Sequence, residues 1–245
     1  MRRRAHIFLA ALIAGALLLA AGAPAQQDSR TVPSIEFSGT VDPASEKWIA
    51  TALSDADDDD APFAIIRLDT PGGLESSMRE IIRDIIEAPM PVVVHVSPDG
   101  ARAASAGAFI TEAADVAAMA PQTNIGSASA IQSTGEDIGG TLELKIENDA
   151  AAFIRALADA HGRDGSLPER MVRDADNFTA QEALDGDAID LVVAGEDELL
   201  AELDGFRVAG PKEQVLDTTG IEIERRDTPI QYEILQVLVN PTIAY

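Results

Sequence analysis

The stretch Gly100-Ala-Arg-Ala-Ala-Ser105-Ala-Gly-Ala-Phe-Ile110 sets one serine hydroxyl among alanine and glycine residues, just after an apolar segment at 91–96 (PVVVHV). Small residues let another backbone approach closely, which a nucleophile that attacks a peptide requires. The same residues also fit an ordinary turn from a strand into a helix, with Ser105 as the N-cap of that helix. On this stretch alone, both interpretations stay open.

A second marker lies upstream, where Leu68-Asp-Thr-Pro-Gly-Gly73 turns sharply from an apolar strand into an amphipathic helix. Backbone N–H groups that open a helix can bind a developing oxyanion. The amides of Gly72 and Gly73, together with that of Ala106 after the serine, are therefore candidates for an oxyanion hole. The alternative is a plain turn that needs glycine for its backbone shape.

Apolar strands alternate with amphipathic helices along most of the chain. This order predicts an α/β domain with a largely parallel sheet. The expected strands cover residues 32–38, 63–68, 92–96, 116–119 and 189–194, with hairpin strands within 206–224. The expected helices cover residues 43–53, 75–87, 144–161, 168–173, 180–185, 196–203 and 230–239, with a short helix after Ser105. Residues 133–142, rich in glycine and polar side chains, predict a loop that covers an active site.

The acidic run at residues 55–60 (DADDDD) is predicted to end the first helix as a solvated segment. It lacks the spaced ligands and central glycine of a calcium-binding loop. The whole chain carries a net charge of −24 from 42 acidic and 18 basic residues, which argues against binding to nucleic acid. Because the chain has no cysteine, disulfides, thiolate catalysis and cysteine-bound zinc are excluded. We expect no metal and no cofactor.

The N-terminus has the pattern of an export signal. Three arginines at 2–4 precede an apolar run at 7–22 and an Ala23-Pro24-Ala25 cleavage pattern. We therefore assign residues 1–25 to a signal peptide, with a retained anchor as the alternative. The domain is then expected to work outside the cytoplasm, on the periplasmic or extracytoplasmic side of the membrane.

A serine hydroxyl needs a base to accept its proton. The chain has three histidines: His6 lies in the signal segment, His95 is expected in the core of the sheet, and His161 at a helix C-terminus. A Ser-His-Asp triad is therefore disfavoured. Lys145 is the better candidate, because it follows the predicted loop at the expected start of a long helix, where the helix dipole opposes a cation. The alternative is a solvated lysine at a helix start.

Two further lysines compete for this role. We expect Lys47 on a surface helix and Lys212 in a polar hairpin. Neither setting suits a general base, so Lys145 is the partner that we assign to Ser105.

Several motifs together resemble the NfeD-type membrane-bound serine proteases, which are ClpP-class proteins typically encoded beside a stomatin or prohibitin homologue. The resemblance covers residues 32–245 and rests on five motifs in order: Leu68-Asp-Thr-Pro-Gly-Gly73, Ala103-Ala-Ser105-Ala-Gly107, Met119-Ala-Pro121, Asn124-Ile-Gly126 and Lys145. It implies a ClpP/crotonase-like fold of β-β-α units and a Ser-Lys dyad, with Ser105 as nucleophile and Lys145 as general base. It places Gly72, Gly73 and Ala106 around the oxyanion.

The resemblance also implies self-association as a homodimer or higher oligomer, and cleavage of apolar stretches in a partner such as a stomatin-like membrane protein. We assign residues 31–208 to the protease domain and 209–245 to a C-terminal segment. Fuller family members continue from that segment into transmembrane helices and a β-barrel domain. On this resemblance we expect the chain to be a short form, a truncated product or one part of a split protein, which leaves membrane attachment open.

Three other functions are compatible with parts of this pattern. A catalytically weak assembly module that binds a stomatin-like partner is the main alternative to the peptidase. A crotonase-type acyl-CoA enzyme shares the fold and the paired amides, but export would remove it from CoA, and Ser105 and Lys145 would have no role. Signal peptide peptidase A uses the same dyad chemistry, although the pairing of Thr-Pro-Gly-Gly with Ala-Ser-Ala-Gly favours the NfeD type.

Overall fold

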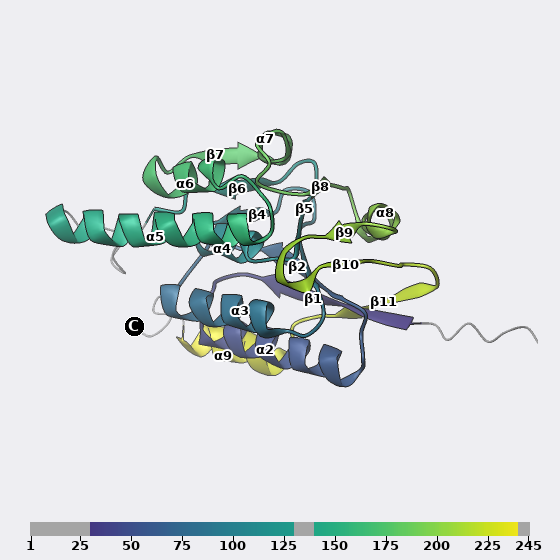
Figure 1. The fold of residues 1–245 in the computed structure, drawn as a ribbon. Helices are drawn as coiled ribbons and strands as arrows, with labels where there is room; N and C mark the ends of the chain where they lie inside the picture. Colours follow the sequence, from purple (N-terminus) through teal and green to yellow (C-terminus); the bar gives the residue numbers. More distant parts are fainter. Residues whose placement is uncertain (1–29, 130–139, 240–245) are drawn as a thin grey trace, which may run out of the picture.

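Six parallel strands form the central sheet, as the computed structural model of residues 30–129 and 140–239 describes it (Figure 1). Their order across the sheet is β11-β1-β2-β3-β5-β8, and each neighbouring pair runs parallel. Their bounds are β1 Arg30–Ser38, β2 Ala64–Asp69, β3 Val92–Val96, β5 Val116–Met119, β8 Leu191–Val192 and β11 Ile221–Arg226. The predicted α/β class with a largely parallel sheet is confirmed.

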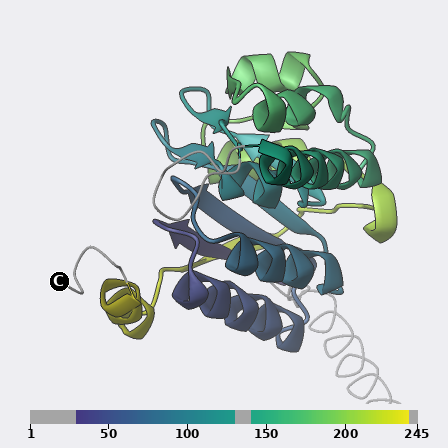
Figure 2. The same ribbon diagram turned by 90° about the vertical axis from the view of Figure 1, so that its left-hand side faces the viewer.

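One face of this sheet is covered by α2 (Pro43–Asp58), α3 (Glu75–Glu87) and α4 (Ala106–Glu112) (Figure 2). Alternate strand residues such as Ile35, Ile66 and Val94 point into this layer and are fully buried. Apolar strands that are buried on both faces are typical of parallel sheets, because helices cover each side.

The other face packs against α8 (Glu196–Leu203) and a small hairpin of β9 (Arg207–Val208) and β10 (Gln214–Val215). Ile65 and Val93, next to Ile66 and Val94 in sequence, belong to this second core. A 3₁₀ turn at Gly210–Lys212 connects the two hairpin strands. The hairpin was predicted within residues 206–224, whereas β11 from the end of that range pairs in parallel with β1.

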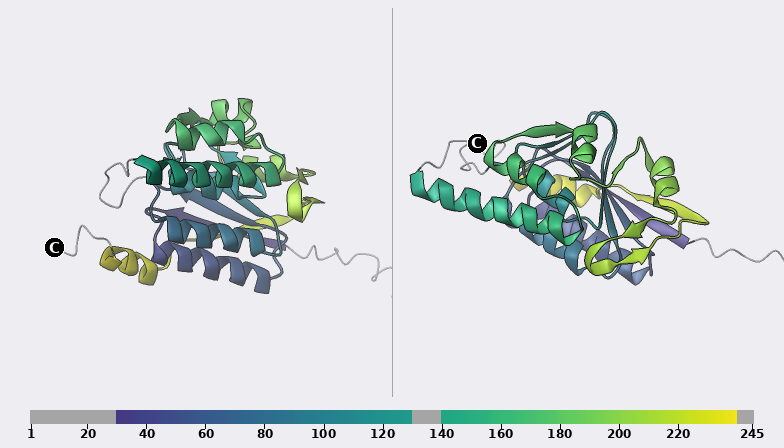
Figure 3. Two further views of the ribbon diagram at one scale, coloured as in Figure 1. Left: turned by 60° about the vertical axis from the view of Figure 1, so that its left-hand side comes forward. Right: turned by 45° about the horizontal axis from the view of Figure 1, so that its top comes forward.

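A second, smaller sheet carries the serine segment. Its strands are β4 (Arg102–Ala104), β6 (Asn124–Gly126) and β7 (Asn177–Thr179), in the order β4-β6-β7. The helices α6 (Ser166–Arg173) and α7 (Ala180–Asp185) flank it, and α5 (Gly140–Ala160) packs across α4 and α6 (Figure 3). The N-terminal part of α5 extends beyond the body of the molecule in Figure 1 and in the right-hand view of Figure 3. The buried residues of this helix begin only at Ala151.

The first helix is longer than the sequence predicts. The acidic run does not end α2 at residue 53: the helix continues to Asp58, because Ala56 still faces the core while Asp55, Asp57 and Asp58 face solvent. The last helix, α9 (Ile230–Val239), matches its predicted bounds and lies beside α2, where Tyr232 packs on Trp48 with 5.8 Å between ring centroids (Figure 2). Within residues 30–129 and 140–239, we find no helix long and apolar enough to span a bilayer.

Candidate active site

Ser105 occupies a strained turn between β4 and α4. Its φ of 53° and ψ of −113° place it outside the regions that serine normally adopts, and such outliers concentrate at functional sites. The Ser105 amide donates to the Gly126 carbonyl at 3.0 Å, which ties the turn to β6. Ser105 is the N-cap residue of α4, as the turn interpretation expects, but its side chain makes no capping hydrogen bond to the helix. Its half-buried hydroxyl is therefore not used to cap the helix.

The Gly72 turn packs directly on this serine. A Cβ atom built on Gly72 would lie 2.6 Å from Ser105 Cβ and 3.1 Å from Ser105 Oγ, so a side chain there would collide with the nucleophile candidate. Gly72 also has a φ of +100°, which side chains rarely allow. The glycine is thus required by both conformation and space, and it brings the two sequence markers together.

The backbone amides near Ser105 differ in whether they already donate a hydrogen bond. The Gly72 N–H donates to Thr70 Oγ1 at 3.0 Å. Among residues 30–129 and 140–239, no acceptor is found for the amides of Gly73 and Ala106. Gly73 itself is held against Val41, since an added Cβ would meet the Val41 carbonyl oxygen at 2.1 Å. Of the three predicted oxyanion residues, Gly73 and Ala106 therefore have an available donor, whereas the Gly72 donor is occupied.

Lys145 lies in the second turn of α5 and its side chain is exposed. The helix begins at Gly140 rather than near residue 144, so residues 140–142 are helical and not part of a loop; residues 133–139 fall outside the described part of the chain. The influence of a helix N-terminus falls off within its first turn. The setting at the helix start that was predicted for Lys145 is therefore wrong.

Phe153 fixes the body of α5 over the other helices. Its ring packs on Phe109 of α4, with 6.0 Å between ring centroids, and the Arg79 guanidinium of α3 lies 4.6 Å from the ring centroid on α5. Arg79 also pairs with Asp149 of α5 at 2.8 Å. Lys145 is eight residues before Phe153, a distance of about 12 Å along a helix that rises 1.5 Å per residue. The structure thus attaches the helix of Lys145 close to α4, but carries the lysine itself beyond this contact.

The two described histidines are engaged elsewhere. His95 is buried in β3 as predicted, and its Nε2 lies 3.1 Å from the Val193 carbonyl oxygen. His161 follows α5 and is also buried, with Nδ1 3.9 Å from Asp115 Oδ1. Burial lowers the pKa of both imidazoles. These contacts agree with the prediction that no Ser-His-Asp triad forms, while His6 lies outside the described residues.

Lys212 differs from its expected polar surroundings. Its Nζ donates to the Ile85 carbonyl at 2.7 Å and to Asp115 at 2.8 Å, and only 11% of its side chain is exposed. It therefore ties the 3₁₀ turn of the hairpin to the end of α3. This role is structural and distant in sequence from the serine turn.

The C-terminal end of α4 is buried around Glu112. Desolvation raises the pKa of this carboxyl to about 8, and both of its oxygens lack a hydrogen-bond partner in the described chain. Arg163 lies 3.7 Å from Glu112 Oε2, but it pairs more closely with Asp190 at 3.1 Å and donates to the Glu112 carbonyl at 3.0 Å. The helix that begins after Ser105 is thus anchored at its other end by a buried polar cluster.

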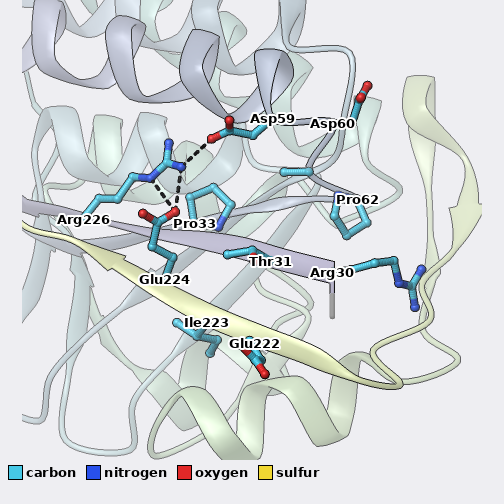
Figure 4. Close-up of a pocket in the computed structure, with 11 residues that line it drawn as sticks. Arg30, Thr31, Pro33, Asp59, Asp60, Pro62, Glu222, Ile223, Glu224 and Arg226 are labelled. Atoms are coloured by element: carbon cyan, nitrogen blue, oxygen red, sulfur yellow. Dashed lines mark hydrogen bonds and ion pairs between the residues drawn. The ribbon is translucent and has the colours of Figure 1, made fainter. Parts of the chain in front are cut away.

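A cavity of about 730 Å³ opens at the other end of the sheet, where β1 and β11 begin (Figure 4). Arg226 crosses it to bind Asp59 and Glu224, each at 2.8 Å. Because the strands are parallel, this cavity is separated by the length of β1 and β2 from the Gly72 turn, which follows the carboxyl end of β2. It is not part of the serine site.

Comparison with known families identifies the chain. The family model described as "NfeD1b, N-terminal domain" matches residues 31–204. The chain belongs to this family. The resemblance to NfeD-type proteins is thereby confirmed.

Two curated relatives agree with this placement. The chain is 32% identical over 195 residues to the membrane-bound protease PH1510 of Pyrococcus horikoshii, covering 78% of this chain and 44% of that protein. It is 34% identical over 130 residues to the membrane protein NfeD1b of Bacillus subtilis, covering 52% and 29% respectively. The chain therefore spans less than half the length of these relatives.

Solved structures extend the likeness to three dimensions. A lysine-to-alanine mutant of the 1510-N membrane-bound stomatin-specific protease, in complex with a substrate peptide, superimposes with a TM-score of 0.81 at 27% identity, covering 86% of this chain and 98% of that one. A serine-to-alanine mutant of the same protease has a TM-score of 0.76 at 30% identity, covering 81% and 98%. ClpP1 from Listeria monocytogenes, at 18% identity and a TM-score of 0.55, covering 70% and 95%, shares the fold. The predicted ClpP-like fold and the relation to serine-type proteases are confirmed.

Proposed function

We propose that this protein is a serine endopeptidase in which Ser105 is the nucleophile and Lys145 the general base. The observation that carries the proposal is the strained Ser105 turn, whose side chain does not cap α4 and which packs against Gly72. The mutants among the solved relatives replace a serine and a lysine, which are the two residue types of the proposed dyad. The 1510-N relatives are proteases, which supports the same reaction class here.

In the proposed reaction, neutral Lys145 accepts the Ser105 proton while Ser105 Oγ attacks the carbonyl carbon of the peptide bond. The carbonyl oxygen becomes an oxyanion, which the available amides of Gly73 and Ala106 stabilise. Lys145 then donates its proton to the leaving amine as the C–N bond breaks. A water molecule, deprotonated by Lys145, attacks the ester carbonyl of the acyl-enzyme. The bond to Ser105 Oγ then breaks, Lys145 returns the proton to Oγ, and the carboxylic acid product leaves.

This reaction requires Lys145 to move or to be covered, because it is exposed on α5. We propose that self-association, or a bound substrate, covers this part of the helix. Leu142 and Leu144 support the idea, since they are 59% and 58% exposed beside Lys145. A lysine covered by apolar groups loses its charge more readily and becomes a better base.

The proposed substrate is an apolar stretch of a membrane-associated protein, such as a stomatin-like partner. Its support is that one solved relative is described as specific for a stomatin homologue. We further propose that the domain works on the exported side of the membrane, on the strength of the N-terminal pattern at residues 1–25, which lie outside the described residues.

The test compares wild type with Ser105→Ala and with Ser54→Ala, an exposed serine on α2 that serves as the control. Wild type and Ser54→Ala should cleave an apolar peptide and become labelled by a fluorophosphonate, with the label mapped to Ser105. Ser105→Ala should do neither while keeping its thermal unfolding midpoint. Cleavage by Ser105→Ala at the wild-type rate would refute the assignment.

A catalytically weak assembly module remains the competing function, and the exposure of Lys145 is the observation that favours it. A purified stomatin-like protein would then bind wild type and Ser105→Ala equally, and no fluorophosphonate would react with Ser105. Fluorophosphonate labelling of Ser105, in the monomer or in any oligomer, would support the peptidase and exclude the inactive module.

A further inference from the structure

Thr70 connects the two halves of the serine site. It is fully buried, its N–H donates to the Arg102 carbonyl at 2.8 Å, and its carbonyl accepts from Ala104 at 3.1 Å. These bonds place it beside Ala103 in a parallel bridge, so the segment after β2 is held in register with the strand that delivers Ser105. The backbone of Thr70 would make these bonds with any side chain except proline.

The side chain adds two separate contacts. Its Oγ1 accepts the Gly72 N–H at 3.0 Å, a bond from a residue to the amide two positions later that is typical of threonine turns. Its Cγ2 packs against α4, because a Cβ atom built on Gly107 would lie 2.6 Å from Cγ2. The hydroxyl thus acts on the Gly72–Gly73 turn, and the methyl group acts on the helix of Ser105.

The Thr70 hydroxyl accepts a hydrogen bond from the Gly72 amide and leaves the Gly73 amide unbonded within the described chain. With the Gly72 N–H turned toward Thr70, the neighbouring Gly73 N–H makes no hydrogen bond with a residue of the described chain. The Gly73 N–H lies in the same peptide plane as the Gly72 carbonyl, which accepts from the Val41 N–H at 2.9 Å. The Thr70 hydroxyl holds the plane before Gly72 and Val41 holds the plane after it, so the two bonds together set the conformation of this glycine. The turn lies against Ser105, where an oxyanion would form.

We propose that Thr70 is a positioning residue for the reaction: its hydroxyl holds the Gly72 amide and, together with the bond from Val41 to the Gly72 carbonyl, aims the Gly73 amide at the oxyanion. This inference rests on the proposed peptidase function of Ser105. It assigns the oxyanion donors as Gly73 and Ala106, with Gly72 required for its shape and not as a donor. Thr70 itself touches no reacting atom.

Two pairs of variants isolate the hydroxyl. Thr70→Val removes it and keeps the side-chain shape, whereas Thr70→Ser and Thr70→Ala both lack Cγ2 and differ from each other only in the hydroxyl. Thr111→Val is the matched control, because Thr111 is also fully buried and bonds a backbone group, the Gly107 carbonyl, at 2.9 Å. The readouts are kcat and KM for an apolar peptide, peptide affinity in the Ser105→Ala background, and inhibition by a peptide boronate that mimics the tetrahedral intermediate.

Loss of one oxyanion donor typically costs about 10²–10³ in kcat, and a misaimed donor should cost about 10- to 100-fold. We expect this loss for Thr70→Val relative to wild type and for Thr70→Ala relative to Thr70→Ser, with KM and peptide affinity within about threefold. Boronate inhibition should weaken in proportion to the loss of kcat/KM. The control Thr111→Val should keep the wild-type kcat and the wild-type inhibition by the boronate. All rates are normalised to the concentration of folded enzyme.

Equal kcat for Thr70→Ser and Thr70→Ala would overturn the inference, as would a Thr70→Val loss no greater than that of Thr111→Val. If Thr70→Val does not fold, the Ser and Ala pair still decides. An active, unlabelled Ser105→Ala variant would refute the peptidase proposal itself. An inactive Ser105→Ala beside a fully active Thr70→Val would refute only the role of Thr70.

Discussion

The two sides of the proposed dyad are built in opposite ways. Ser105 lies in a tight turn, where Gly72 contacts its side chain and Gly126 accepts its amide hydrogen, so its position is fixed by buried backbone. Lys145 lies on an exposed part of α5, which salt bridges on its surface hold to the neighbouring helices. Surface salt bridges contribute only about 0–1 kcal/mol each. The nucleophile is therefore preorganised, whereas the base is held by contacts that can rearrange.

The largest effect should come from the base. Lys145→Ala is expected to lower kcat for an apolar peptide by about 10²–10⁴-fold, the usual contribution of general acid-base catalysis. Lys47→Ala, on the exposed surface of α2, is the control and should retain activity. Steady-state kinetics measure kcat for both variants. A wild-type kcat for Lys145→Ala would show that Lys145 is not the general base.

A substitution that disturbs the Ser105 turn should lower kcat nearly as much. Gly72→Ala places a Cβ atom 2.6 Å from Ser105 Cβ at a φ of +100°, so either the turn or the serine must move. We expect kcat to fall by about 10²-fold or more, as for a lost oxyanion contact. Gly195→Ala, where nothing lies within 4 Å of the added Cβ, is the control. A Gly72→Ala variant with wild-type kcat would show that the turn does not constrain Ser105.

Weakening the attachment of α5 to α3 should lower kcat by a smaller factor. Arg79→Ala removes the ion pair to Asp149 and the contact with the Phe153 ring, so the helix of Lys145 is less well held. We expect a loss of about 3- to 10-fold in kcat, in keeping with one exposed ion pair and one cation–π contact. The unfolding midpoint should change little.

Arg83→Ala is the control for this variant, because Arg83 is also on α3 but pairs within that helix, with Glu80. High salt should narrow the difference between wild type and Arg79→Ala, since exposed charges are screened. Equal kcat for both variants at low salt would mean that Arg79 does not position the base.

The smallest effect on activity should come from Glu112, at the anchored end of α4. Burial raises its pKa from 4.5 to about 8, so the folded protein holds a proton that the unfolded chain has released. The free energy of unfolding of wild type, relative to Glu112→Gln, should therefore fall as the pH rises from about 4.5 to about 8, and level off above that range. Urea unfolding at several pH values measures this difference.

Glu202→Gln, an exposed position on α8, should show no such trend. A difference between wild type and Glu112→Gln that is independent of pH would contradict the raised pKa. Peptide turnover by Glu112→Gln at pH 7 should stay near wild type, since the glutamine resembles the protonated acid.

The sequence by itself determined the features that depend on neighbours along the chain. Apolar periodicity and turn residues predicted β3, β5, α3, α7, α8 and α9 with their observed bounds, because strands and helices follow local side-chain patterns. The glycine and alanine residues around Ser105 likewise predicted a close approach of backbone, and Gly72 makes that approach.

Only the tertiary structure decided the features that depend on contacts between distant segments. No local pattern distinguishes a hairpin strand from β11, whose partner β1 lies at the other end of the chain. The burial of Lys212 and Glu112 and the exposure of Lys145 likewise follow from what packs around each residue, because solvation of a charge is set by the surrounding fold. The residue types at the site are thus encoded locally, whereas the separation of the serine turn from the exposed end of α5 is a property of the packed helices.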